Sequence, residues 1–231
     1  MIFRQLFDPA SSTYTYLLAD ERSGEAALVD PVREQVERDL RLVAELGVRL
    51  AWVLETHVHA DHVTAAGLLR ERTGARTVSS VRGAACADQH VRHGDVIAVG
   101  AIELHVLETP GHTDDSVSYL VDDRVLTGDA LTIRGAGRTD FQNGDAHTLY
   151  RSITEVLFRL PGPMLVYPGH DYRGQTVSTI DEERRHNPRL AGKTEAEFVA
   201  IMEGLGLPPP RQIAEAVPAN RACGAVPGAS A

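Results

Sequence analysis

The distribution of apolar residues along the chain predicts short strands that alternate with helices. Tyr14–Leu18 and Ala26–Val29 are nearly continuous apolar stretches of strand length, and Leu50–Leu54 predicts a third, buried strand. Between the second and third stretches, residues 33–46 place apolar side chains three to four positions apart and stop at Gly47. This spacing predicts an amphipathic helix that ends at the glycine.

The rest of the chain predicts a strand-rich segment followed by helices. We expect strands at 77–80, 96–99, 102–107, 117–121, 125–126 and 164–167, and helices at 148–160, 179–185 and 195–205. Each half then combines strands with helices, which predicts an α/β fold of two mixed sheets packed together and covered by helices outside. We predict a single domain over residues 1–231, with a short helical extension over about 176–207 and an irregular tail over 208–231.

The composition fits one enzyme domain and argues against several classes of partner. With 231 residues, 43% of them hydrophobic, the chain can bury a large core. The formal net charge of −9 argues against a nucleic-acid partner, because phosphate binding needs a basic surface. No apolar run reaches the length of about 18 residues that predicts a transmembrane helix, so we expect no membrane partner.

Met1 leads almost directly into strand-like sequence and leaves no room for a signal or transit peptide, which predicts a cytoplasmic protein. The sequence does not define the oligomeric state, and a homodimer is one candidate.

The two cysteines add little to the prediction of fold and function. Cys86 and Cys223 are the two cysteines of the chain, so the sequence predicts neither a disulfide framework nor a thiolate metal cluster. This pattern suits a reducing compartment. We assign neither cysteine a catalytic role and expect both to be structural or exposed.

One short segment concentrates the candidate chemistry. His57, His59, Asp61 and His62 are four potential metal ligands within six residues, directly after the predicted strand Leu50–Leu54. A His-x-His pair at the end of a strand places both imidazoles on the same side, because strand side chains repeat every two residues. Asp61 and His62 are then expected to begin the next helix. The segment therefore predicts a metal site at a strand-to-helix turn.

Three further candidate ligands follow at the ends of other predicted strands. They are His112 in a Pro-Gly-His turn, Asp129 in a Gly-Asp turn and His170 in a second Pro-Gly-His turn. Each alone is typical of an ordinary surface turn. Together with the first segment, however, they give seven candidate ligands in the order H-x-H-x-D-H, H, D, H. This order resembles the metallo-β-lactamase superfamily, which implies an αββα sandwich with its metal site at the sheet edges. The resemblance does not fix the reaction, because a fold hosts many functions.

A longer set of segments resembles one branch of that superfamily, the persulfide dioxygenases, also called sulfur dioxygenases. The resemblance covers nearly the whole chain, up to Gly224. Gly169, where an alanine is also familiar, and Ala136 are small-residue variations. The segments are Leu126–Gln142, Tyr167–Gly174, Thr176–Arg184, Asn187–Leu190 and Ala216–Asn220.

The resemblance implies one ferrous iron per chain, held by His57, His112 and Asp129. Two imidazoles and one carboxylate form a facial triad with open positions for substrate and dioxygen. The other four candidates would then orient the ligands and bind water. They could instead build the second site of a dinuclear zinc enzyme, and the residues themselves do not separate the two uses. The four are His59, Asp61, His62 and His170.

The implied reaction is the oxidation of glutathione persulfide by O₂ to sulfite and glutathione, a step of sulfide detoxification. Glutathione carries two carboxylates, so cationic and hydrogen-bonding side chains should hold it. Arg138 lies in the Gly-rich loop after Asp129, Tyr172 lies just past the third predicted turn, and Arg189 lies in an Asn-Pro-Arg turn. Each could equally be structural, and Asp140 is a nearby ion-pair candidate for Arg138.

Two alternatives remain. The first is a dinuclear zinc thioester hydrolase of the glyoxalase II kind, with a bridging hydroxide. Its usual C-terminal helical substrate domain needs more chain than follows His170 here. The second is a metal-binding or redox-sensing module without catalytic activity, which seven converging ligand candidates disfavour.

Overall fold

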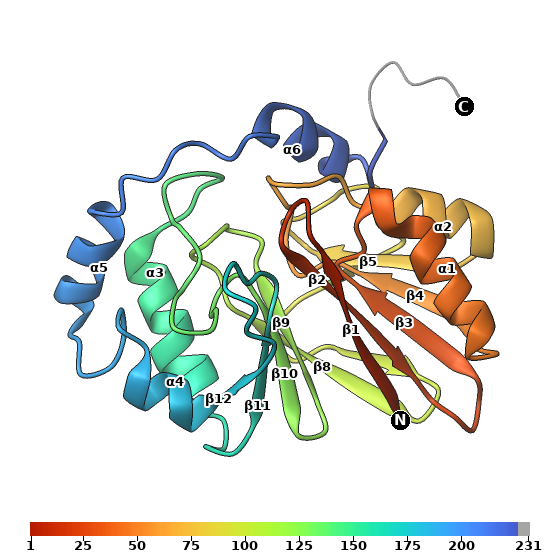
Figure 1. Ribbon diagram of the computed structural model, residues 1–231, viewed down its shortest axis with the longest axis horizontal. Helices are drawn as coiled ribbons and strands as arrows, with labels where there is room; N and C mark the ends of the chain where they lie inside the picture. Colours follow the sequence, from red (N-terminus) through yellow and green to blue (C-terminus); the bar gives the residue numbers. More distant parts are fainter. Residues whose placement is uncertain (226–231) are drawn as a thin grey trace. The chain divides into compact units, whose positions relative to one another are not determined.

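The computed structural model describes residues 1–225 (Figure 1), and its chain divides into two compact units. Among the described residues, unit 1 comprises residues 1–91, 96–104 and 209–225. Unit 2 comprises residues 92–95 and 105–208. Whether the two units act as the predicted single domain stays a prediction.

Unit 1 is built on a six-stranded sheet in the order β1-β2-β3-β4-β5-β6. The first three strands pair antiparallel, and the next three join in parallel. Parallel pairing needs a crossover, which α1 supplies between β3 and β4 and α2 supplies between β4 and β5. Both helices lie beside this sheet (Figure 1). The elements are β1 Ile2–Asp8, β2 Thr13–Ala19, β3 Glu25–Val29, α1 Val36–Glu45 after a 3₁₀ turn at Arg33–Gln35, β4 Arg49–Leu54, α2 Ala66–Thr73, β5 Arg76–Ser80 and β6 Gln89–Val91.

The core of unit 1 confirms the apolar pattern of the sequence. β2 is buried along its whole length, as its nearly continuous apolar stretch predicts. Leu17, Leu28 and Val53 of the sheet pack with Val43 of α1 and Leu69 of α2. The helix predicted to begin near His62 begins instead at Ala66. The intervening residues form turns whose backbone groups bond to other parts of the unit.

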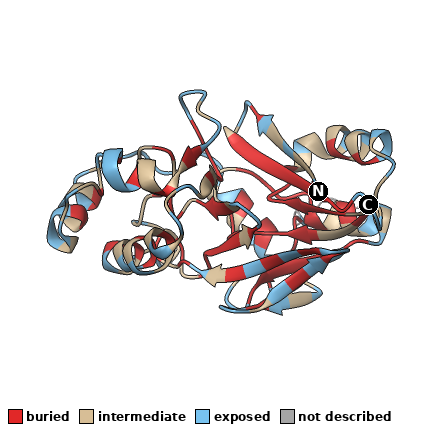
Figure 2. Cartoon of the chain, turned by 90° about the horizontal axis from the view of Figure 1, so that it is seen from below, coloured by how far each residue is buried: buried red, intermediate tan, exposed pale blue. Residues whose placement is uncertain are grey.

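The second sheet has the order β12-β11-β10-β9-β8-β7, and the boundary between the units falls within β8. β10 and β11 pair in parallel, whereas β8, β9 and β10 form antiparallel neighbours. β8 alternates buried and exposed residues over its first five positions, so one face of it meets solvent (Figure 2). The elements are β7 Val96–Val99, β8 Ile102–Glu108, β9 Val117–Val121, β10 Arg124–Gly128, α3 Ala146–Arg151, β11 Leu165–Pro168, β12 Ser178–Thr179, α4 Ile180–His186 and α5 Glu195–Glu203.

The helix predicted over 148–160 is irregular in its second half. The Asp145 side chain accepts a hydrogen bond from the Thr148 backbone N–H at 2.7 Å and caps the start of α3. A π-helical turn then covers Ser152–Val156, and a 3₁₀ turn covers Leu157–Arg159. The Thr154 hydroxyl donates to the Tyr150 carbonyl at 2.8 Å, and such bonds compete with the regular helix pattern.

The C-terminal region differs from the sequence prediction. α4 and α5 form within the predicted helical extension. The tail predicted to be irregular contains a further helix, α6 Ile213–Arg221, although Pro218 lies inside it. Its Ala216 and Ala219 pack against Val63, so tertiary burial stabilises a helix that the composition disfavours. Residues 226–231 of that predicted tail lie outside the described residues. No helix among residues 1–225 combines the length and apolarity needed to cross a bilayer.

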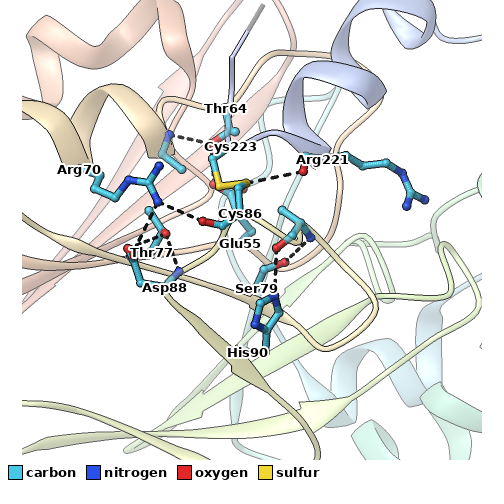
Figure 3. The surroundings of a disulfide bond; sticks show 12 residues. Glu55, Thr64, Arg70, Thr77, Ser79, Cys86, Asp88, His90, Arg221 and Cys223 are labelled. Atoms are coloured by element: carbon cyan, nitrogen blue, oxygen red, sulfur yellow. Dashed lines mark hydrogen bonds and ion pairs between the residues drawn. A yellow bond between two sulfur atoms is a disulfide. The ribbon is translucent and has the colours of Figure 1, made fainter.

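A disulfide joins Cys86 and Cys223, which corrects the expectation that the two cysteines are unlinked (Figure 3). Their Cα atoms lie 6.0 Å apart, within the usual range for a bridge. The two residues are 137 positions apart in sequence, so their proximity arises only through the tertiary fold of unit 1.

Candidate metal centre

Unit 1 gathers the residues of the H-x-H-x-D-H segment on the loop between β4 and α2. The His57 and His59 rings lie 4.0 Å apart between centroids, and the His59 and His62 rings lie 4.4 Å apart. All three imidazoles are buried, whereas Asp61 is partly exposed. His59, Asp61 and His62 offer ligand atoms within 4.8 Å of one another. The structure thus confirms that this segment forms a compact group.

A hydrogen-bonded relay fixes the proton on His57. The Thr56 hydroxyl donates to Asp30 Oδ2 at 2.8 Å, and the Thr56 backbone N–H donates to Asp30 Oδ1 at 2.7 Å. His57 Nδ1 lies 2.9 Å from the same hydroxyl oxygen. Because that hydroxyl has given its proton to Asp30, it accepts from His57 Nδ1–H. The lone pair of His57 is then on Nε2, where it can bind a metal ion.

His59 faces carboxylates. Its Nε2 lies 3.1 Å from Asp30 Oδ1 and 3.6 Å from Glu55 Oε2, and all three residues are buried. Burial lowers the pKa of His59, but the Asp30, Asp61 and Glu55 carboxylates raise it to about 9 overall. Asp30 adopts a left-handed backbone conformation with φ of 52°, which directs its carboxylate back toward this loop.

The remaining pair of the loop is Asp61 and His62. His62 Nδ1 lies 3.0 Å from Asp61 Oδ2 and 3.3 Å from the Thr13 hydroxyl of β2. The Thr13 hydroxyl also donates to Asp61 Oδ2 at 3.3 Å. A neighbouring strand therefore helps to orient both side chains.

Unit 2 brings the other three candidates together. Asp129 directly follows β10, and His170 follows β11 by two residues. These strands are parallel neighbours with Gly128 opposite Pro168, so the two side chains leave the same edge of the sheet. His170 Nδ1 lies 2.7 Å from Asp129 Oδ1, where it donates a hydrogen bond to the carboxylate.

His112 completes this half of the site. It lies in the loop after β8, and its Nδ1 is 2.6 Å from the Arg138 carbonyl oxygen, which can only accept. The lone pair of neutral His112 is therefore on Nε2, which lies 3.6 Å from Asp129 Oδ2. Two acceptor atoms that face each other repel weakly, and a cation bound by both would remove that repulsion. The donor set of unit 2 thus fits a metal ion.

Two glycines allow the backbone to approach this cluster. A Cβ atom at Gly137 would lie 2.4 Å from the Asp129 carbonyl oxygen and 2.7 Å from the His112 ring. A Cβ atom at Gly169 would lie 2.9 Å from Asp129 Oδ1. Gly169 therefore has less room for a side chain than is expected of a position where an alanine is also familiar.

The three predicted substrate-binding residues have different surroundings. Arg138 forms a bidentate ion pair with Asp140, both bonds at 2.7 Å, and donates to the carbonyls of Leu207 and Pro208. Tyr172 is 77% exposed and stacks on His170, with 6.1 Å between centroids. Unit 2 also contains a cavity of about 350 Å³ that Arg138 and Asp140 line together with residues of α5.

Arg189 is half-buried and donates from Nη1 to the Ala136 carbonyl at 2.6 Å. Desolvation lowers the pKa of its guanidinium, with a smaller effect from the nearby Arg173 charge. Among residues 1–225, no carboxylate forms an ion pair with Arg189. This half-buried positive charge is a candidate for binding an anion.

Three residues that organise the H-x-H-x-D-H segment were not among the predicted site residues. Asp30 and Thr56 fix the His57 tautomer, and Asn220 of α6 bonds to the loop backbone. Asp30 and Thr56 carried a signal, since one ends a strand and the other immediately precedes the first histidine. Neither of these two signals, a strand end or a neighbouring histidine, pointed to Asn220.

The chain is similar to several known proteins. The chain matches the metallo-β-lactamase superfamily model over residues 8–85 and 87–170. Persulfide dioxygenase ETHE1 of Bos taurus and that of Homo sapiens, both named as mitochondrial, are each 52% identical over 227 residues, covering 97% of this chain and 89% of each relative. The crystal structure of ETHE1 from Myxococcus xanthus aligns with a TM-score of 0.97 and 65% identity, covering 97% of this chain and 100% of that one.

The fold and the metal-ligand groups define a member of the metallo-β-lactamase superfamily. The predicted fold class, with two mixed sheets flanked by helices, is confirmed. Within that superfamily, the chain belongs to the persulfide dioxygenase family, as the sequence resemblance indicated.

Proposed function

We propose that this protein uses one Fe(II) per chain to oxidise glutathione persulfide with O₂, releasing sulfite and glutathione. Membership of the persulfide dioxygenase family makes the chain a sulfur dioxygenase, which is an oxidoreductase. The net reaction consumes one glutathione persulfide, one O₂ and one water. It yields glutathione and sulfurous acid, which ionises to sulfite.

We propose His57, His112 and Asp129 as the iron ligands. The support is that both imidazoles have their Nδ1 atoms engaged, by Thr56 and by the Arg138 carbonyl, which places the ring lone pair of each neutral imidazole on Nε2. Asp129 likewise has one oxygen engaged by a hydrogen bond and presents the other toward His112 Nε2. Two imidazole nitrogens and one carboxylate oxygen form the facial triad that suits non-haem Fe(II). When bound, iron supplies the redox chemistry that allows triplet O₂ to react.

One observation supports an orienting role for His59. His59 Nε2 faces Asp30 Oδ1 at 3.1 Å, so this nitrogen points toward a carboxylate inside unit 1. We propose that His59, Asp61, His62 and His170 orient the ligand loops and bind water, as the structured surroundings of each support. A dinuclear zinc hydrolase would need several of these residues as ligands.

We propose Arg189 as the main cation for a glutathione carboxylate. A half-buried guanidinium without a carboxylate partner among the described residues gains most from an anionic ligand, because its charge is already partly desolvated. Tyr172 is exposed beside His170 and has a hydroxyl that can bond to the peptide part of the substrate. Arg138 is the weakest of the three candidates, because Asp140 already holds its guanidinium.

Metal content and oxygen consumption test the proposal. Protein purified without added metal should contain about one iron per chain, as a facial triad requires. With glutathione persulfide it should consume dissolved O₂, form sulfite in equal amount and stop when oxygen is removed. Two zinc ions per chain, with rapid hydrolysis of S-lactoylglutathione under anaerobic conditions, would replace the proposal with a thioester hydrolase.

We also propose a cytoplasmic location, and we treat a homodimer as a candidate assembly. Cell fractionation with an antibody against this chain tests the location. Light scattering of the purified protein tests the assembly, where a mass near 25.0 kDa would indicate a monomer.

A further inference from the structure

Asn220 of α6 forms three hydrogen bonds with the H-x-H-x-D-H loop of unit 1. Its Nδ2 donates to the His59 carbonyl at 2.9 Å and to the His62 carbonyl at 2.8 Å. Its Oδ1 accepts from the Thr64 backbone N–H at 2.8 Å. The Asn220 side chain is 3% exposed, so these bonds are shielded from water. One amide side chain therefore satisfies three backbone groups of a loop that has no regular secondary structure.

The loop needs such a partner. It is the long turn between β4 and α2, in which Asn220 supplies donors to the His59 and His62 carbonyls and the Arg33 backbone N–H donates to the Val63 carbonyl at 2.9 Å. A buried backbone carbonyl that loses its donor is destabilising, so removal of the Asn220 amide would disfavour this conformation of the loop. Val63, directly after the last histidine, also packs against Ala216 and Ala219 of α6.

The residues after α6 continue this contact with the backbone of unit 1. The Cys223 carbonyl accepts from the Gly67 N–H at 2.8 Å, and the Gly224 carbonyl accepts from Arg33 Nη1 at 2.6 Å. A Cβ atom at Gly67 would lie 2.5 Å from the Cys223 carbonyl oxygen. A Cβ atom at Gly224 would lie 2.3 Å from the Thr64 carbonyl oxygen. The C-terminal segment is thus fitted closely to the start of α2.

The disulfide fixes this segment covalently. Cys223 follows Asn220 by three residues, and its sulfur is bonded to Cys86, which lies between β5 and β6 (Figure 3). Cys86 is itself held, because its carbonyl accepts from Arg70 Nη1 of α2 at 3.0 Å. Without the bridge, α6 would be attached to the sheet of unit 1 only by noncovalent contacts.

We infer that Asn220 is a positioning residue that holds the His57–His62 loop in its metal-binding conformation, and that the Cys86–Cys223 disulfide holds Asn220 in place. Reduction of the disulfide then loosens the loop and speeds the loss of metal. The link to metal rests on the proposed function, in which His57 supplies a ligand. The link between Asn220, the disulfide and the loop rests on unit 1 alone.

Hydrogen exchange of the metal-free protein tests the positioning role without reference to any metal. Asn220→Ala should speed exchange of the Thr64 amide by roughly tenfold or more, since local opening controls exchange. Hydrogen exchange of the Thr64 and Gly67 amides should also be faster in reduced wild type. The same should hold in the double variant Cys86→Ser with Cys223→Ser. Val43→Ala, a core change in α1, controls for general destabilisation and should leave the Thr64 amide protected relative to the rest of unit 1. Unchanged Thr64 exchange in both Asn220→Ala and the reduced protein would overturn the inference.

Metal release tests the consequence for the site. Each protein is loaded with Fe(II), or with Zn²⁺ if that is the metal it retains, and then mixed with a chelator. Asn220→Ala and the reduced wild type should release metal faster than oxidised wild type, and Val43→Ala should not. Faster exchange with unchanged metal release would overturn the positioning role, whereas a failure to retain iron would count against the proposed function alone.

Asn220→Asp provides a variant with a selective defect. It keeps an acceptor for the Thr64 N–H but removes the donor to the His59 and His62 carbonyls. Metal release should therefore be fast while the Thr64 amide stays more protected than in Asn220→Ala. If Asn220→Ala does not fold, Asn220→Ser replaces it in both measurements.

Discussion

His170 Nδ1 donates a hydrogen bond to Asp129 Oδ1 at 2.7 Å. This bond engages one oxygen of the carboxylate and directs the other toward His112 Nε2. It also links the ends of two adjacent parallel strands, because Asp129 follows β10 and His170 follows β11. The oxygen of Asp129 that we propose as an iron ligand is therefore selected by a residue that need not bind the metal itself.

Removal of a proposed ligand should have a larger effect than removal of this orienting histidine. His57→Ala, His112→Ala and Asp129→Ala should each abolish iron retention and turnover, because two remaining protein ligands leave a weak site. His170→Ala should weaken metal affinity by roughly 10- to 100-fold, as loss of an orienting partner typically does. Iron analysis and oxygen uptake on the same samples provide the measurement. His105→Ala, an exposed histidine of β8, is the control and should change neither quantity. Full iron and full activity in Asp129→Ala would refute the ligand set.

Two glycine substitutions should differ in severity. Gly137→Ala should strongly reduce iron content, because its Cβ would meet the Asp129 backbone oxygen and the His112 ring, neither of which can move without displacing a ligand. Gly169→Ala should be the milder change, because its Cβ would lie 2.9 Å from a side-chain oxygen of Asp129 and 3.1 Å from the Gly128 carbonyl carbon, which are longer approaches than those at Gly137. Metal content after purification and dialysis gives the comparison. A larger loss in Gly169→Ala than in Gly137→Ala would contradict the geometry.

Replacement of Arg189 should change the kinetics for glutathione persulfide more than replacement of Arg138. Arg189→Ala should raise KM for glutathione persulfide, since a lost charged hydrogen bond costs about 1.5–3 kcal/mol, or roughly 10- to 100-fold in kcat/KM. Arg138→Ala should have the smaller effect on KM, because Asp140 already holds that guanidinium. Tyr172→Phe should raise KM modestly. Oxygen uptake against substrate concentration, with iron quantified in parallel, measures each effect. An unchanged KM in Arg189→Ala would place the glutathione site elsewhere.

The disulfide should stabilise unit 1 measurably. Cys86→Ser should lower the free energy of unfolding by about 2–5 kcal/mol, the usual cost of losing a native bridge. Thermal and denaturant unfolding of the variant and of oxidised wild type give the difference. Wild type treated with a thiol reductant should match the variant, and the same reductant should leave Cys86→Ser unchanged. Equal stability of all four samples would show that the bridge contributes nothing.

Much of the fold could be predicted because its signals are local. The apolar stretch at Leu50–Leu54 and the helical spacing over 33–46 both correspond to observed elements. α6 could not be predicted in this way, because its stability depends on the packing of Ala216 and Ala219 against Val63. The start of α2 was placed too early, because the turns after His62 are held by bonds to distant residues rather than by local propensity.

The candidate site was predictable as a list of residue types but not as a hydrogen-bond network. His57, His112 and Asp129 stand at strand ends where functional loops are expected. Their tautomers depend on Thr56 with Asp30 and on the Arg138 carbonyl, which no spacing rule identifies. The disulfide was missed for the same reason, since a separation of 137 residues gives no sign of proximity.

The disulfide also encloses a large part of the polypeptide in one covalent ring. Every residue of unit 2 lies between Cys86 and Cys223 in sequence. A protease that cuts the backbone once within unit 2 therefore produces two fragments that stay linked through sulfur. Such a nicked molecule would migrate near its full mass on a non-reducing gel and separate only after reduction. The integrity of a preparation of this protein has to be judged under reducing conditions.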